Sequence, residues 1–275
     1  MKEKAKRFLQ YLYISIRKPE MEVLPGNLAF FFMMMIIPLL TILATIIANL
    51  DVGKSTLYEA LRTSFPENIA TLISSIAGEG STNSTWILLI VSLILASNGT
   101  YSMIVTSNSI YGIKKSSYIK NKFKSIILVI VLVILFTILL VIPVINTKVI
   151  DFIAKLTKTD MATNLYYLLY NVLKYPVTFL LVFVFVKILY KFSPSGGKRK
   201  RTSYGAVFTS VLLVLSTWLY SFYIEYFSNY ETYYGGISSI LFLMIWINLI
   251  SYIFVLGMNM NAAREKMINE NNKVQ

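Results

Sequence analysis

The chain has 275 residues, of which 56% are hydrophobic and only 14% are charged, and its formal net charge is +13. Soluble domains carry about 25% charged residues, so this composition is typical of a membrane protein. The chain has no Cys and no His. This excludes disulfides, the usual zinc, haem and iron–sulfur ligands, thiol nucleophiles and imidazole bases. We therefore expect no metal, no cofactor, no catalytic residue and no enzymatic activity.

Six stretches are long and apolar enough to cross a bilayer, which takes about 20 residues each. They predict an all-α integral membrane protein with six transmembrane helices and short interfacial helices. The predicted spans are residues 28–50, 85–113, 126–144, 165–190, 204–227 and 235–262. Residues 27–263 then form the membrane domain, between an amphipathic N-terminal segment (residues 1–26) and a tail (residues 264–275). Apolar residues at helical spacing within residues 51–83 predict two further short interfacial helices.

Lys and Arg are distributed unevenly between the two sides of this topology. Nineteen of the 26 lie in the N-terminal segment, the loops before spans three and five, and the tail, whereas five lie in the opposite loops. The positive-inside rule therefore places both termini in the cytoplasm. The same charges predict contact with anionic lipid headgroups on the cytoplasmic face. We interpret "GKRKR" (residues 197–201) as a membrane-proximal loop and expect no nucleic-acid partner.

The sequence does not meet the requirements of two motifs that would indicate hydrolytic chemistry. "DVGKST" (residues 51–56) resembles the end of a phosphate-binding loop, but Ala48 stands where that motif needs its first Gly, and a membrane span precedes it instead of a strand. Two-metal hydrolysis needs clustered carboxylates. All three Asp lie in predicted outer loops, and the inner Glu residues are confined to the terminal segments, so a cytoplasmic nuclease site is not expected.

Two of the predicted spans carry amides and hydroxyls at helical spacing. In span two these positions are Asn98, Tyr101, Val105, Asn108 and Gly112, and in span six they are Asn248, Tyr252, Val255 and Asn259. Polar groups in hydrocarbon need partners, so we expect both faces to turn inward. Two interpretations remain open at this point. The amides bond one helix to another, or Asn98, Tyr101, Asn108, Asn248, Tyr252 and Asn259 line a shared substrate path.

Other intramembrane residues suggest kinks and a charge contact. Pro38 and Pro176 interrupt spans one and four and predict kinks. Lys174, in the outer third of span four, is expected either to reach the outer interface, to hold an anionic headgroup, or to pair with Glu225 near the outer end of span five. Trp218 and the Tyr residues around it are typical of an aromatic belt at the membrane interface.

Several segments resemble the BrkB/YihY family of bacterial inner-membrane proteins, some of which carry the label ribonuclease BN. The resembling segments, in chain order, are "LAFFFMMMIIPLL", "ASNGTYSMIVTSNSIYG", "SYGA" and "YYGGISSILFLMIWINLISYIFVLGMNMNAA". The resemblance covers residues 20–265 and implies a six-helix protein of the bacterial cytoplasmic membrane. One position departs from the family, which often has Glu where this chain has Asn259, so a proton-coupled role of that acid does not carry over.

The resemblance implies export or envelope lipid transport, and we expect a transporter or translocase of a lipid or other amphiphile. The alternative is a membrane scaffold that organises envelope proteins without transport. A translocase needs a polar groove open to one leaflet, whereas a scaffold would have sealed polar faces. The directions in which Asn98 and Asn248 point distinguish the two hypotheses.

Overall fold

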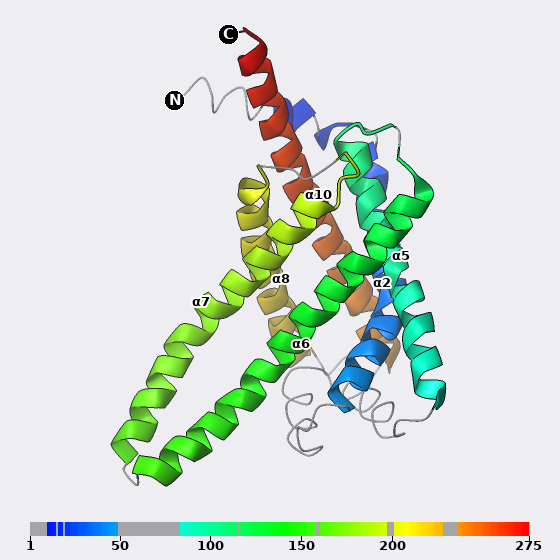
Figure 1. Cartoon of the computed structure of the whole chain (residues 1–275). Helices are drawn as coiled ribbons and strands as arrows, with labels where there is room; N and C mark the ends of the chain where they lie inside the picture. Colours follow the sequence, from blue (N-terminus) through cyan, green and yellow to red (C-terminus); the bar gives the residue numbers. More distant parts are fainter. Residues whose placement is uncertain are drawn as a thin grey trace. The chain divides into compact units, whose positions relative to one another are not determined.

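The structure is a computed structural model that describes residues 10–14, 16–18, 20–48, 83–114, 116–157, 160–196, 201–227 and 236–274. These ranges contain helices and connecting turns, and no β-strand lies within them. The long helices are α2 (Glu20–Ala48), α5 (Asn83–Ile110), α6 (Tyr118–Thr157), α7 (Asp160–Phe192), α8 (Ser203–Phe227) and α10 (Gly236–Val274) (Figure 1). Each predicted span falls mainly within one of these helices, so the all-α fold class is confirmed.

Five of these helices contain a stretch long and apolar enough to cross a membrane. The five stretches are Glu20–Leu43, Leu89–Ile110, Tyr118–Ile138, Ser203–Phe222 and Leu241–Glu270. The predicted fourth span, residues 165–190, lies in α7, where most side chains before Pro176 are outside the described part. Five spans therefore have structural support, and the sixth stays a prediction.

The helices extend beyond the apolar stretches that predicted them. Helix α6 begins at Tyr118 instead of residue 126, and α10 continues to Val274 through the segment expected to be a tail. Helix α2 begins at Glu20, within the expected N-terminal segment. The backbone hydrogen bonds of a helix are satisfied internally, so a helix does not have to end where its side chains become polar. The interfacial helices expected within residues 51–83 lie outside the described residues, apart from Asn83.

The chain divides into two compact units, and some of the long helices are divided between them. The first unit consists of Met1–Met34, Asn98–Ser125 and Val182–Gln275, and the second of Met35–Ser97 and Ile126–Leu181. The second unit contains the second half of α2, the first half of α5, most of α6 and the first part of α7. The polar contacts between helices described below all belong to the first unit.

In the first unit, α8 packs along α10. Where the two helices cross, two glycines leave no room for a larger side chain. A Cβ atom at Gly257 would lie 2.0 Å from Thr209 Oγ1, and one at Gly205 would lie 2.1 Å from the carbonyl oxygen of Gly257. Small residues allow such close backbone approach between membrane helices. The Tyr190 side chain of α7 is buried against this crossing, and its hydroxyl lies 2.6 Å from Thr209 Oγ1.

The Tyr190 hydroxyl also donates to the carbonyl oxygen of Phe254, at 2.9 Å. Either hydroxyl can be the donor in the 2.6 Å contact between Tyr190 and Thr209, and the Thr209 hydroxyl also lies 3.5 Å from the carbonyl oxygen of Ile253. The rings of Tyr190 and Phe254 meet edge to face at 5.8 Å. Three helices, α7, α8 and α10, are thus joined by one buried polar chain, which makes this crossing the core of the first unit.

Candidate functional site

The first turns of α6 lie beside the middle of α5. The hydroxyl of Thr100 donates to the carbonyl oxygen of Ser125 at 2.7 Å, and the rings of Tyr101 and Tyr118 meet edge to face at 5.5 Å. These α5 residues lie near the centre of its candidate span, Leu89–Ile110. After Gly112, whose φ of 67° makes the turn, the connection to α6 therefore runs back along α5. The basic first turns of α6 therefore lie beside the apolar span of α5.

This arrangement places an ammonium group against the amide of α5. Lys122 Nζ donates to Asn98 Oδ1 at 2.6 Å and lies 5.9 Å from the centre of the Tyr101 ring, within the range of a cation–π contact. Asn98, Tyr101 and Lys122 are half-buried, and Tyr118 is 64% exposed. We call these four residues the Lys122 site. It is polar, cationic and accessible from outside the chain.

The charge of the Lys122 site is not balanced within the described part of the chain. No carboxylate there forms an ion pair with Lys122, and the sequence has no acidic residue between Glu79 and Asp151. An ammonium group has three hydrogens to donate, of which Asn98 takes one. Charges within a membrane span are costly and are usually paired or functional. Within the described part, Lys122 therefore contacts the amide of Asn98 and the ring of Tyr101 but no carboxylate.

A second polar cluster holds the turn that follows α7. Asn108 Nδ2 donates to Ser195 Oγ at 2.7 Å, while the backbone N–H of Ser195 donates to Asn108 Oδ1 at 2.8 Å. Ser195 Oγ in turn donates to Asn121 Oδ1 at 2.7 Å. Both amides are buried, and these bonds link the ends of α5, α6 and α7. We call Asn108, Asn121 and Ser195 the loop clamp.

Lys124 strengthens the same region by a different interaction. Its ammonium group donates to the carbonyl oxygens of Ser193 and Pro194, at 3.2 and 2.8 Å. These carbonyls follow the last turn of α7, where unpaired carbonyl oxygens and the helix dipole favour a cation. Lys122 and Lys124 therefore differ in role, because Lys124 is committed to the backbone whereas Lys122 keeps hydrogens to donate.

The predicted polar face of α5 is divided between these two clusters. Asn98 and Tyr101 belong to the half-buried Lys122 site, Val105 is 39% exposed, and Asn108 is buried in the loop clamp. Asn98 was expected to turn inward, into the protein or a hydrated groove. It is half-buried, and its amide oxygen accepts a hydrogen bond from Lys122 of α6. A polar group in a membrane requires a partner, and a neighbouring helix can supply one without a central groove.

The predicted polar face of α10 changes its environment along the helix. Asn248 is exposed and Tyr252 is 43% exposed, whereas Val255 and Asn259 are buried. Asn248 was expected to turn inward, into the protein or a hydrated groove, and its side chain is exposed in the structure. Residues 253–263 of α10 are buried or half-buried, so a face defined by helical spacing passes from an exposed to a buried environment along the helix. Convergence of both faces on one groove stays a prediction.

Asn259 joins α10 to α2. Its Nδ2 donates to the carbonyl oxygen of Val255 at 3.0 Å and contacts the sulfur of Met21 at 2.8 Å. The side chain is 3% exposed. This geometry favours the interpretation of helix-to-helix bonding for Asn259, since its amide hydrogens are used inside the bundle.

The remaining predicted residues are placed only in part. Pro38 is buried within α2, and Pro176 is exposed within α7; the kinks expected there stay predictions. Lys174 and Glu225 lie in α7 and α8, but their side chains are outside the described part of the structure. No group of three or more acidic residues that could hold a metal ion occurs among the described residues.

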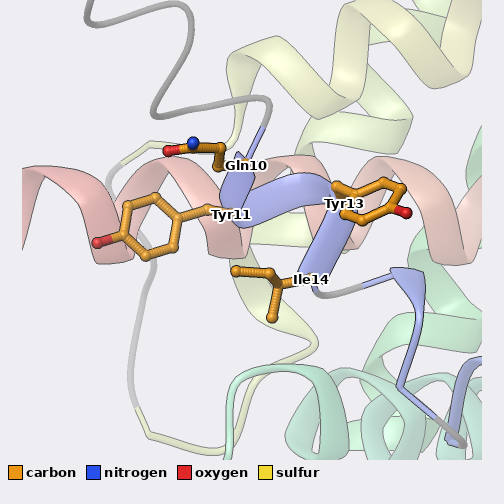
Figure 2. A pocket seen from close by; sticks show the side chains of 4 residues that line it. All are labelled: Gln10, Tyr11, Tyr13 and Ile14. Carbon is orange, nitrogen blue, oxygen red and sulfur yellow. The ribbon is translucent and has the colours of Figure 1, made fainter.

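An open pocket lies elsewhere, at the N-terminal segment. Figure 2 shows its lining residues, Gln10, Tyr11, Tyr13 and Ile14, on a short helical stretch beside α10, with Tyr11 and Tyr13 pointing to opposite sides. The hydroxyl of Tyr11 donates to Glu270, and Lys266 lies over the Tyr11 ring. These contacts attach the N-terminal segment to the end of α10, and the pocket holds no cluster of chemically reactive groups.

Sequence reasoning used Lys122 and Lys124 only as topology signals and did not single out Asn121 or Ser195. A usable signal was present in "YIKNKFKS" (residues 118–125), where three Lys directly precede an apolar run. Counting these Lys as loop charges concealed that they belong to a helix. Their partners are far away in the sequence, so pattern alone could not identify them.

Comparison with known proteins agrees with this architecture. The sequence profile of the family described as "Virulence factor BrkB" matches residues 15–275. The "Putative ribonuclease-like protein YfkH" of Bacillus subtilis is 27% identical over 96% of this chain and 98% of its own length. The "UPF0761 membrane protein IL2447" of Idiomarina loihiensis is 33% identical over 30% of each chain. No solved structure matches the chain significantly. With its apolar helices and a family match over nearly its whole length, the chain belongs to the BrkB family of membrane proteins.

Proposed function

We propose that this protein is a transporter or translocase that moves a lipid or other amphiphile of the cell envelope across the cytoplasmic membrane. In this proposal six helices span the bilayer, α7 included, and both termini lie in the cytoplasm. The charge distribution supports the orientation, since nineteen of 26 basic residues fall on one side. The length of α7, 33 residues, supports a sixth span, because about 20 residues suffice.

One observation supports a transport role above the others. The Lys122 site places a half-buried cation beside the middle of the α5 span, and no acidic residue in the described part neutralises it. Lys122 also lies within the candidate span of α6, Tyr118–Ile138, close to its cytoplasmic start, and ionisable groups within a span commonly mark substrate or ion pathways. A group kept only for helix packing would have a partner for its charge. Lys122 has an amide, which satisfies one of its hydrogens but not its charge.

An amphiphile fits the surroundings of Lys122 better than a small hydrophilic solute. Ile119 and Phe123, on the same turns of α6, are 77% and 67% exposed, and Val105 of α5 is 39% exposed. An acyl chain could stay against these side chains and the bilayer while its headgroup contacts Lys122. The protein would then lower the barrier that the headgroup meets in hydrocarbon, because a charged group there loses its hydration.

The scaffold alternative has its own supporting observation. The loop clamp is buried and closed, with the amide of Asn108 and the hydroxyl of Ser195 bonded within the protein. Sealed polar contacts of this kind are what a scaffold requires. The two functions are distinguished by whether the purified protein moves lipid and whether that movement depends on Lys122.

The test is lipid exchange in proteoliposomes. Liposomes containing a fluorescent phosphatidylglycerol are treated with dithionite, which is impermeant and bleaches only the outer leaflet. With the wild-type protein, labelled lipid should move between the leaflets, so that dithionite bleaches the fluorescence of both. Lys122→Gln should slow the loss of inner-leaflet fluorescence about tenfold. Lys120→Gln is the matched control, because Lys120 is exposed on the same helix turn and the charge change is identical. Wild-type vesicles that bleach no further than protein-free vesicles would refute translocation and leave the scaffold.

A further inference from the structure

We propose that the Lys122 site binds the phosphate of an anionic phospholipid through Lys122 Nζ and Asn98 Nδ2 together. This deepens the proposed function by assigning the headgroup class, and as a binding statement it can be tested without transport. Asn98 Oδ1 accepts from Lys122 at 2.6 Å, which fixes the orientation of the amide. Its Nδ2 group then has two hydrogens next to the ammonium group, with no hydrogen bond to another described residue.

Two adjacent donors, one of them charged, suit the oxygens of a phosphate. Charge-assisted hydrogen bonds are about twice as strong as neutral ones, and Lys is a common phosphate ligand that acts as a point charge. The segment between Glu79 and Asp151 contains no acidic residue, so the field around Lys122 is positive. This local field favours a ligand with net negative charge.

A zwitterionic headgroup is a poorer match at the same site. Its cation would need a carboxylate or the open face of an aromatic ring. No described carboxylate lies at the Lys122 site, and the Tyr101 ring is already shared between Lys122 at 5.9 Å and the edge contact with Tyr118. The headgroup of phosphatidylglycerol brings a phosphate without a compensating cation, so it should bind more tightly than that of phosphatidylcholine.

A lipid is favoured over a soluble phosphate by the position of the site. Lys122 is half-buried near the middle of the α5 span, next to the exposed apolar side chains of Ile119 and Phe123. A phospholipid reaches this position with its acyl chains in the bilayer beside these side chains. A free phosphate would have to leave water and lose its hydration to reach it.

The test measures lipid binding by native mass spectrometry of the full-length protein in detergent. Dioleoyl phosphatidylglycerol and dioleoyl phosphatidylcholine are titrated separately, and the ratio of their dissociation constants is compared among variants. The wild type and the matched control Lys120→Gln should prefer phosphatidylglycerol about tenfold, equivalent to about 1.4 kcal/mol. Lys122→Gln should bring the ratio close to one.

Asn98→Asp provides a second variant that keeps the size of the side chain. The new carboxylate lies within hydrogen-bond distance of Lys122 and neutralises it internally, so the preference should also fall to about one while the fold is retained. Preserved preference in both Lys122→Gln and Asn98→Asp would overturn the proposal, as would equal loss in Lys120→Gln. Displacement of the lipid by an equimolar amount of glycerol 3-phosphate would overturn the assignment to a lipid.

This experiment separates the two proposals. A wild-type protein that prefers phosphatidylglycerol but moves no lipid in liposomes would retain the headgroup site and lose the translocase function. A wild-type protein that moves lipid without any preference between the two headgroups would retain the function and lose the headgroup site.

Discussion

Replacement of Gly257 by Ala tests the packing of the α8–α10 crossing. The added Cβ would lie 2.0 Å from Thr209 Oγ1, 2.4 Å from the Tyr190 hydroxyl and 3.0 Å from the carbonyl oxygen of Gly205. Contacts below 3.0 Å require atoms to move. Both hydroxyls are buried and bonded to each other, so a shift that relieves the clash breaks the bond between them or separates the helices.

The expected cost follows from these two effects. Overpacking of a core costs about 1–3 kcal/mol, and each lost neutral hydrogen bond about 0.5–1.5 kcal/mol. Together these two effects cost about 2–4 kcal/mol. This exceeds the gain of about 0.5–1 kcal/mol that Ala gives over Gly within a helix. The net sign is destabilising.

The assay is thermal unfolding of the purified protein in detergent, followed by loss of the monodisperse peak in size-exclusion chromatography. Gly26→Ala is the control, because Gly26 also lies in a helix, α2, and a Cβ there meets nothing within 4 Å. Gly26→Ala should raise the midpoint and Gly257→Ala should lower it. Thr209→Ala added to Gly257→Ala should recover part of the loss by removing the nearest atom. An unchanged midpoint in Gly257→Ala would refute the close approach described for this crossing.

Four further predictions concern the topology, the loop clamp, the Lys122 site and catalysis. With no native Cys, Lys114→Cys should react with an impermeant thiol reagent only in lysed cells and Asn83→Cys also in intact cells; labelling of Lys114→Cys from outside would contradict the topology. Asn108→Leu should lower the unfolding midpoint, because it leaves the Ser195 N–H without its acceptor at about 1–3 kcal/mol. Asn98→Leu should instead reduce lipid exchange while membrane abundance is retained, and an equal fall in abundance would make Asn98 a packing residue. The purified protein should not cleave RNA in Mg²⁺ or Mn²⁺, since inner carboxylates are not clustered; cleavage lost on mutating both glutamates in the first turn of α2 would overturn this.

The sequence was sufficient to predict the helices but not the contacts between them. Apolar runs of about 20 residues have only the helix available in a bilayer, because every backbone group must be bonded internally. The helices α2, α5, α6, α7, α8 and α10 therefore occur where the hydropathy pattern predicted spans. Their ends were less predictable. The start of α6 at Tyr118 depends on a polar stretch being helical, which hydropathy does not report.

Helical spacing identified polar faces correctly as sets of neighbouring positions, but not their surroundings. Asn98 and Asn108 share a face of α5, yet one bonds to Lys122 and the other to Ser195. Asn248 and Asn259 share a face of α10, yet one is exposed and the other buried. Spacing fixes the direction of a side chain from its own helix axis, whereas its environment depends on which other helices reach that level.

What the sequence determined by itself was the membrane class, the helical fold and the family, since these depend on composition, local hydrogen bonding and motifs read in order. What only the tertiary structure decided was which groups the cations at the start of α6 contact. Lys122 and Lys124 are two residues apart and chemically identical, but the second reaches the carbonyl oxygens at the end of α7 and the first reaches one amide of α5. These hydrogen bonds join residues 24 and 70 positions apart in the chain, and contacts over such separations form only when helices pack.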